Sequence, residues 1–193
     1  MLAGKRDKFA FLEKALGPAF SFLPANAWTL IAVLFSAGTA YFLATQQFLY
    51  AGAALSVTGL LDMVDGAVAR ATKKAGPKGA YLDTIADRYA EGIIIFGLLL
   101  SGLPSIALPA YYWIFIYFFG GSLTTYAKAA FKEKTGKDLG GGLVERAERL
   151  VLLAIGVFMA AINPDYLMYI IMLLAVLTNL TAVQRIMAGL KNV

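Results

Sequence analysis

The sequence predicts an all-α fold, namely a polytopic membrane helix bundle of six transmembrane helices with an N-terminal amphipathic interfacial helix. First, 60% of its 193 residues are hydrophobic and 15% are charged, whereas soluble domains carry about 25% charged residues. Second, the mean hydropathy is +0.70. Third, all 17 Lys and Arg residues fall into four short segments between apolar stretches. These observations identify the bilayer as the solvent of the chain.

The N-terminal segment, residues 1–25, mixes basic residues with Phe and Leu. It lacks the continuous apolar core and the small-residue cleavage site of a signal peptide. We therefore expect an amphipathic helix that lies on the cytoplasmic interface of the membrane. A disordered basic tail is the alternative.

Six apolar stretches follow, and they predict the six membrane helices. Some are shorter than the roughly 20 residues that span a bilayer, but adjoining polar turns can extend them where they line a protein cavity. Since no soluble domain or long linker interrupts the chain, we expect a single membrane domain over residues 1–193. The three glycines at 140–142 indicate a flexible cytoplasmic loop or a plain turn between helices. The stretches are 27–44, 48–61, 85–103, 106–126, 150–162 and 166–183.

The basic residues predict the orientation. Lys and Arg are confined to residues 5–14, 70–88, 128–149 and 185–191, and the connections between these segments contain none. By the positive-inside rule, both termini and the two basic connections face the cytoplasm. The positive charge, a net +5, is therefore expected on the cytoplasmic face, where it suits anionic lipid headgroups and nucleotide phosphates. We expect no nucleic-acid partner.

The chain contains neither Cys nor His. Disulfides, thiol nucleophiles and the usual zinc ligands are therefore excluded. Any metal must be held by oxygen ligands, which favours Mg²⁺ or Mn²⁺. Proton transfer falls to a carboxylate or to another group that is not His.

Two pairs of aspartates stand near the ends of the second and third apolar stretches. The pairs are Asp62 with Asp65, and Asp83 with Asp87. Spacings of three and four residues put each pair on one face of its helix, so two facing helices bring the carboxylates together. An unpaired charge near hydrocarbon has a high free-energy cost, so we expect bound cations to compensate the negative charge of this cluster. The sequence therefore predicts a metal site in the cytoplasmic third of the membrane.

The residues around these aspartates read D-x2-D-G-x2-A-R-x8-G-x3-D-x3-D. This pattern resembles the signature of the CDP-alcohol phosphotransferases. Members of this family are integral membrane enzymes that displace CMP from a CDP-linked alcohol and join the remaining phosphate to a second alcohol. The resemblance implies a CDP-lipid donor, either CDP-diacylglycerol or CDP-archaeol, and two divalent cations, Mg²⁺ or Mn²⁺.

The resemblance also implies roles for individual residues. Asp62, Asp65, Asp83 and Asp87 are expected metal ligands, and Asp87 is the expected catalytic base; whether it is base, ligand or both stays open in the sequence. Asn26 and Thr29 also fit the family, although helix capping explains Asn26 equally well. The nucleotide-binding residues that it implies are Asp62, Gly66, Ala69, Arg70, Gly79 and Thr29.

A second segment bears on the acceptor alcohol. Residues 142–150 resemble the G-x-x-E-R-x-E-R-L pattern of the branch that transfers the lipid-phosphate group to inositol phosphate. Ala130 stands where that branch often has Arg, a departure for which Lys132 or Arg149 could compensate. Glycerol-3-phosphate is the main alternative acceptor, because it also presents a phosphate and a free hydroxyl, while serine requires less positive charge. Positive-inside anchoring is the alternative role of the basic residues. The residues expected to bind the acceptor phosphate are Lys128, Arg146, Arg149 and Arg185.

These observations lead us to expect an enzyme of phospholipid synthesis that transfers a lipid-phosphate group from a CDP-lipid to inositol phosphate and releases CMP. Its expected partners are membrane lipids and, by resemblance, a second copy in a homodimer. A cation transporter that uses the acidic cluster as a relay is the alternative from another class. Transport predicts ionisable residues through the whole bilayer, and the outer half of the expected bundle has almost none.

Overall fold

The computed structural model describes residues 16–192, and the regular elements within this range are α-helices. This confirms the all-α class. Pro77 is the first residue of α4 (Pro77–Leu100), a position where the backbone N–H that proline lacks would have no partner within the helix. The helices are α2 (Ala25–Ala44), α3 (Phe48–Ala71), α4 (Pro77–Leu100), α5 (Ala110–Thr135), α6 (Arg146–Ala160) and α7 (Pro164–Asn192).

Within the described range, α2, α3 and α7 are long and apolar enough to cross a membrane. Helix α6 has only 15 residues, α4 carries charged residues along its first half, and α5 mixes Tyr, Gly and Thr with its apolar residues. A membrane protein of helices is therefore supported, while the expectation of six transmembrane helices stays a prediction.

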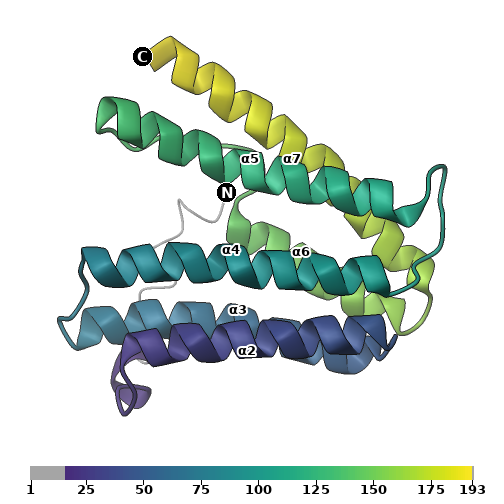
Figure 1. The fold of residues 1–193 in the computed structure, drawn as a ribbon, viewed down its shortest axis with the longest axis horizontal. Helices are drawn as coiled ribbons and strands as arrows, with labels where there is room; N and C mark the ends of the chain where they lie inside the picture. Colours follow the sequence, from purple (N-terminus) through teal and green to yellow (C-terminus); the bar gives the residue numbers. More distant parts are fainter. Residues whose placement is uncertain (1–15, 193) are drawn as a thin grey trace. The chain divides into compact units, whose positions relative to one another are not determined.

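Helices α2, α3 and α4 form the first of two compact units, which ends at Ser101. Helix α2 packs against both α3 and α4 (Figure 1). The contact with α4 is close because Gly97 lies against the backbone of Ala40, where a Cβ on Gly97 would collide with Ala40. Small residues allow such approaches between membrane helices. Helix α2 thus sets the positions of the two helices that carry the aspartates.

Trp28 anchors the chain that enters this unit. It belongs to a cluster of buried residues from α2 and α3, and Leu16 and Phe20 pack against that cluster. The indole Nε1 donates a hydrogen bond of 3.0 Å to the carbonyl oxygen of Phe20, and the two rings meet edge to face at 5.3 Å. Residues 1–15 of the expected interfacial segment lie outside the described residues.

The second unit starts at Gly102 and holds α5, α6 and α7. Helix α7 packs against both α5 and α6. Gly120 of α5 faces Thr178, and Gly156 of α6 faces Ile170, at distances that leave little room for a Cβ. Glycines thus mark the closest helix contacts of this unit as well.

The start of α2 and the end of α3 differ from what the sequence predicted. Asn26 is not a helix cap, because α2 begins at Ala25 with Pro24 in the capping position and without a side-chain cap. Helix α3 continues through the motif to Ala71, well beyond the end of its apolar stretch. The motif residues up to Arg70 are therefore helical, which fixes the directions of their side chains.

Candidate active site

Two helices of the first unit deliver the four motif aspartates. Asp62 and Asp65 lie one turn apart on α3, and Asp83 and Asp87 lie one turn apart on α4. Each spacing keeps its pair on one helix face. The helical pattern expected from the sequence is therefore present.

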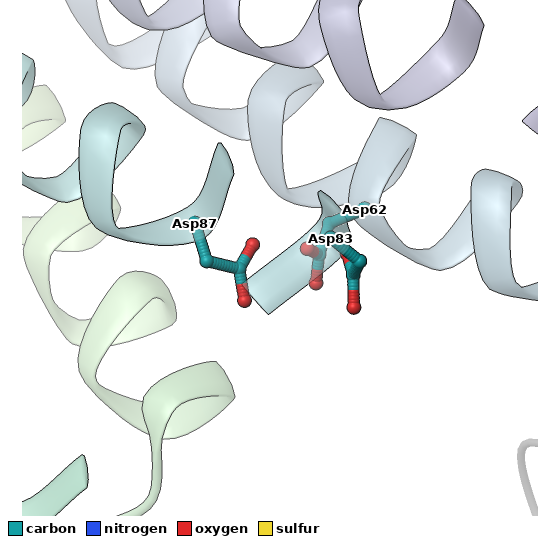
Figure 2. A group of neighbouring side chains, drawn as sticks. All are labelled: Asp62, Asp83 and Asp87. Carbon is teal, nitrogen blue, oxygen red and sulfur yellow. The ribbon is translucent and has the colours of Figure 1, made fainter. Parts of the chain in front are cut away.

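Three of these carboxylates converge. Asp62, Asp83 and Asp87 are half-buried, and each offers an oxygen that lies within 4.8 Å of the other two. Figure 2 shows their carboxyl groups turned toward the same side, one from α3 and two from α4.

The spacing of this group suits a divalent cation. Oxygen ligands stand at about 2.0–2.6 Å from Mg²⁺, Mn²⁺ or Ca²⁺, so ligand oxygens around one ion are at most roughly 5 Å apart. The all-oxygen donor set favours a hard cation over a typical zinc site. Asp62, Asp83 and Asp87 therefore fit a divalent metal.

Asp65, the fourth motif aspartate, is not one of these three, but it lies close enough to Asp83 and Asp62 for their charges to interact. Its side chain is buried, with 6% of its surface exposed, and its Oδ2 accepts a hydrogen bond of 2.7 Å from the hydroxyl of Thr29. The same hydroxyl lies 3.2 Å from the carbonyl oxygen of Ala25. Helix α2 thus holds Asp65 in place, and its expected role as a metal ligand stays a prediction.

A cavity of about 190 Å³ adjoins the carboxylates. Helices α2, α3 and α4 and the connection before α4 form its walls. Asp83 belongs both to the cavity wall and to the group of three carboxylates. The expected nucleotide residues in the wall are Thr29, Gly66, Ala69, Arg70 and Gly79; Asp62 contributes to the carboxylate group instead.

Two glycines keep this cavity open. A Cβ on Gly66 would lie 3.3 Å from Nη1 of Arg70, whose guanidinium folds back over that position. A Cβ on Gly79 would lie 3.8 Å from Oδ1 of Asn26. Side chains at these positions would therefore narrow a space that a ligand can use.

The cavity carries both signs of charge. Asp65 and Asp83 contribute carboxylates, whereas Arg70 and Lys74 contribute cations. Such a lining suits a phosphate-bearing ligand that is accompanied by metal ions. Sequence reasoning missed Lys74 and left Asn26 either as a family position or as a helix cap; both residues line the cavity. The available signal was the basic pair Lys73 and Lys74 between the two halves of the motif. In the structure, Lys73 has φ +55° in the turn after α3.

The four expected acceptor residues lie in the second unit. Lys128 is exposed and Arg146 is half-buried, while Arg149 and Arg185 are only 3% and 8% exposed. Arg185 Nε donates to the carbonyl oxygen of Gly141 at 2.9 Å, and its Nη1 donates to that of Thr124 at 3.0 Å. This guanidinium is therefore already engaged with the backbone.

Comparison with known proteins agrees with the motif. The family model of CDP-alcohol phosphatidyltransferases matches residues 22–181. The chain is 29% identical over 167 residues to archaetidylinositol phosphate synthase of Pyrococcus horikoshii, covering 86% of this chain and 84% of that protein. It is 30% identical to the same enzyme of Methanothermobacter thermautotrophicus, covering 84% and 81%.

The fold agrees as well. Crystal structures of phosphatidylinositol phosphate synthase from Mycobacterium tuberculosis superpose with a TM-score of 0.79 for the complex with manganese and citrate, at 27% identity and 87% and 83% coverage. The structure with CDP-DAG bound gives 0.77, at 26% identity and 92% and 91% coverage. The family match covers both units and the whole aspartate motif, and the chain therefore belongs to the CDP-alcohol phosphatidyltransferase family of transferases.

Proposed function

We propose that the protein transfers a lipid-phosphate group from a CDP-lipid to a hydroxyl of inositol phosphate and releases CMP. The observation that carries this proposal is the junction of the carboxylate group with the cavity at Asp83. A metal site beside a phosphate-sized space with basic residues suits phosphoryl transfer. The names of the relatives support inositol phosphate as the acceptor.

The cavity is the proposed place for the CDP group. Arg70 and Lys74 can contact phosphate oxygens, and Gly66 and Gly79 leave space for the nucleotide beside the backbone. A crystal structure of the M. tuberculosis enzyme has CDP-DAG bound, which supports a CDP-lipid as the donor. The type of lipid tail is left to the assay.

The carboxylates are the proposed holders of two divalent cations. Bound there, the cations would polarise the pyrophosphate and stabilise the departing phosphate oxygen. Asp87 is the proposed base: the acceptor hydroxyl gives its proton to this carboxylate as its oxygen attacks the lipid-bearing phosphorus. The new phosphodiester bond forms while the bond between that phosphorus and the oxygen of CMP breaks.

The proposed acceptor site uses the basic residues of the second unit. Lys128, Arg146 and Arg149 supply positive charge for the phosphate of the acceptor. Arg185 is the fourth expected residue of this set. Glycerol-3-phosphate also presents a phosphate and a free hydroxyl. It is tested beside inositol phosphate because Ala130 departs from the inositol-phosphate pattern.

The proposed arrangement in the membrane has six spanning helices, with both termini and the active site on the cytoplasmic side. At 1.5 Å per residue, the lengths of α4 and α5 are roughly 36 and 39 Å, enough to cross. Helix α6, at roughly 22 Å, would cross only with its adjoining turns. The confinement of Lys and Arg to four segments supports the orientation. A homodimer, suggested by family resemblance, completes the proposal.

The experiment measures CMP release by purified protein in detergent with Mg²⁺ or Mn²⁺. CDP-diacylglycerol and CDP-archaeol are compared as donors, and inositol phosphate, glycerol-3-phosphate, serine and no acceptor are compared in parallel. Asp87→Asn is the inactive variant. Glu133→Gln is the matched control, because Glu133 is an exposed acid at the end of α5.

We expect metal-dependent CMP release with inositol phosphate that Asp87→Asn abolishes and Glu133→Gln leaves intact. Preference for glycerol-3-phosphate would overturn the acceptor and keep the reaction class. CMP release that continues in Asp87→Asn at the wild-type rate would overturn the proposed site.

A further inference from the structure

An ion pair lies on α4 one turn beyond the carboxylate group. Nη1 of Arg88 stands 3.0 Å from Oε2 of Glu91, and the two side chains are 29% and 14% exposed. The pair between Lys134 and Glu133 is far more exposed, and such surface pairs contribute little. The pair on α4 is better shielded from water, so its charges interact more strongly. Charged residues within the helices of a membrane protein are costly and mostly functional.

Glu91 continues the spacing of the motif aspartates. Asp83, Asp87 and Glu91 follow one another along α4 at intervals of four residues, so they share one face of the helix. The same interval brings oxygens of Asp83 and Asp87 within 4.8 Å of each other. The side chain of Glu91 is longer by one methylene group. Glu91 is therefore within reach of the metal group as a competing ligand.

The structure directs Glu91 to a different partner. Side chains on a helix lean toward the residues three and four positions before them. For Glu91 these residues are Arg88 and Asp87, of which one is a cation and the other belongs to the metal group. Glu91 contacts Arg88, and the group of converging oxygens found among the described residues consists of Asp62, Asp83 and Asp87. The ion pair thus separates Glu91 from the metal group.

Arg88 also borders an apolar surface. Together with Tyr89, Gly92, Ile93 and Phe96 it lines a cavity of about 390 Å³. A guanidinium beside apolar surface needs a negative partner or water to offset its lost hydration. Glu91 is such a partner, so the ion pair stabilises both charges at the edge of the carboxylate face.

We propose that Arg88 is a positioning residue that bounds the metal site, because its ion pair holds the carboxylate of Glu91 off the divalent cations. This rests on the proposed function, in which the carboxylate group holds those cations. Asp87 is then the last residue of α4 that faces them. A further carboxylate there would bind the cations more tightly and would neutralise more of the charge that acts on the pyrophosphate. Metal affinity and turnover should therefore change in opposite directions when Arg88 is lost.

The test uses three variants of the pair. Arg88→Met keeps much of the length of the side chain and removes the charge that holds Glu91. The double variant Arg88→Met/Glu91→Gln removes the carboxylate as well and restores the net charge. Arg88→Lys keeps the positive charge and is the conservative variant. Lys134→Met is the matched control, because it takes a cation from an exposed ion pair elsewhere.

Three measurements are made on the purified chain in detergent. Mn²⁺ binding is titrated by electron paramagnetic resonance without any substrate, kcat is measured for CMP release, and the melting temperature is measured in EDTA. Arg88→Met should bind Mn²⁺ about tenfold more tightly and should turn over about tenfold more slowly. The double variant and Arg88→Lys should return both values close to those of the wild type. Lys134→Met should change neither.

Other results would overturn the proposal, each in a different way. Tighter Mn²⁺ binding with wild-type turnover in Arg88→Met would mean that Glu91 acts through its charge alone. Unchanged Mn²⁺ binding with a lower melting temperature would make the pair purely structural. Weaker Mn²⁺ binding in the double variant would make Glu91 itself a metal ligand, and this variant decides if Arg88→Met does not fold. If the wild type releases no CMP with any acceptor, the proposed function fails, while the Mn²⁺ titrations still test the pair.

Discussion

The hydroxyl of Thr29 donates a hydrogen bond of 2.7 Å to Oδ2 of Asp65, and this bond ties the fourth motif aspartate to helix α2. Asp65 is buried, so it depends on hydrogen bonds or cations to offset its lost hydration. Thr29 thus orients a side chain in the cavity wall.

Replacement of Thr29 by valine keeps the shape of the side chain and removes this bond. We expect Thr29→Val to weaken Mn²⁺ binding and CMP release by about tenfold, the effect of losing a hydrogen bond that orients a residue at a metal site. Mn²⁺ binding is measured by electron paramagnetic resonance. The control is Thr39→Val, because the Thr39 hydroxyl bonds to Phe35 within α2. Equal Mn²⁺ affinities in the two variants would contradict a role for Asp65 near the metals.

Asp62 and Asp83 should differ in their effect on nucleotide binding. Both belong to the carboxylate group, but only Asp83 also lines the cavity. Without metal, the negative charge of Asp83 repels a pyrophosphate, so Asp83→Asn should bind CDP more tightly than the wild type. Asp62→Asn should also tighten binding, but by less, because Asp62 does not line the cavity and its charge lies farther from the pyrophosphate. With Mn²⁺ present, both variants should bind CDP more weakly, because each has lost a ligand.

Isothermal titration with CDP, in EDTA and in Mn²⁺, checks this difference. Glu133→Gln is the control for a loss of acidic charge away from the site. If Asp83→Asn lowers CDP affinity in EDTA as much as in Mn²⁺, the carboxylate contacts the nucleotide directly and the electrostatic account is wrong.

Most of the candidate site in the first unit could be predicted from the sequence because its residues share two helices at short spacings. Helical periodicity alone places Asp83 beside Asp87, and the apolar stretches locate the helices. The bond between Thr29 and Asp65 could not be predicted, since it joins residues 36 positions apart and depends on how α2 packs. Lys74 was missed for a related reason: its position depends on the turn after α3, and no periodicity describes a turn.

In the second unit, the sequence predicted the face on which the basic residues lie but not their contacts. Its basic residues could be assigned to a cytoplasmic face from their distribution, but their individual contacts could not. Arg185 has the same sequence context as an anchoring arginine, yet it bonds to Gly141 and Thr124. The glycines at 140–142 indicated a flexible loop or a plain turn, whereas Gly142 packs closely against Thr181 of α7. The contacts of Arg185 and of the glycines both depend on segments that are distant in the sequence, so neighbouring residues alone do not predict them.

The space beside Gly79 should be required for the nucleotide and not for folding. Its Cβ would meet only Oδ1 of Asn26, at the ordinary contact distance of 3.8 Å, so Gly79→Ala should fold normally. The added methyl group should raise KM for the CDP-lipid by about tenfold, a cost of about 1.4 kcal/mol. Gly92→Ala on the same helix, where nothing lies within 4 Å, is the control. A wild-type KM in Gly79→Ala would place the nucleotide elsewhere.

Gly97 should matter for stability and not for chemistry. A Cβ there would collide with the backbone of Ala40, and backbone cannot move aside as the end of a side chain can. Gly97→Ala should therefore push α4 away from α2 and cost about 1–3 kcal/mol, seen as a lower melting temperature of the protein in detergent. Gly38→Ala on α2, where a Cβ meets nothing within 4 Å, should melt at or above the wild-type temperature, because alanine favours the helix. Equal melting temperatures for the two variants would show that α2 and α4 do not pack at Gly97.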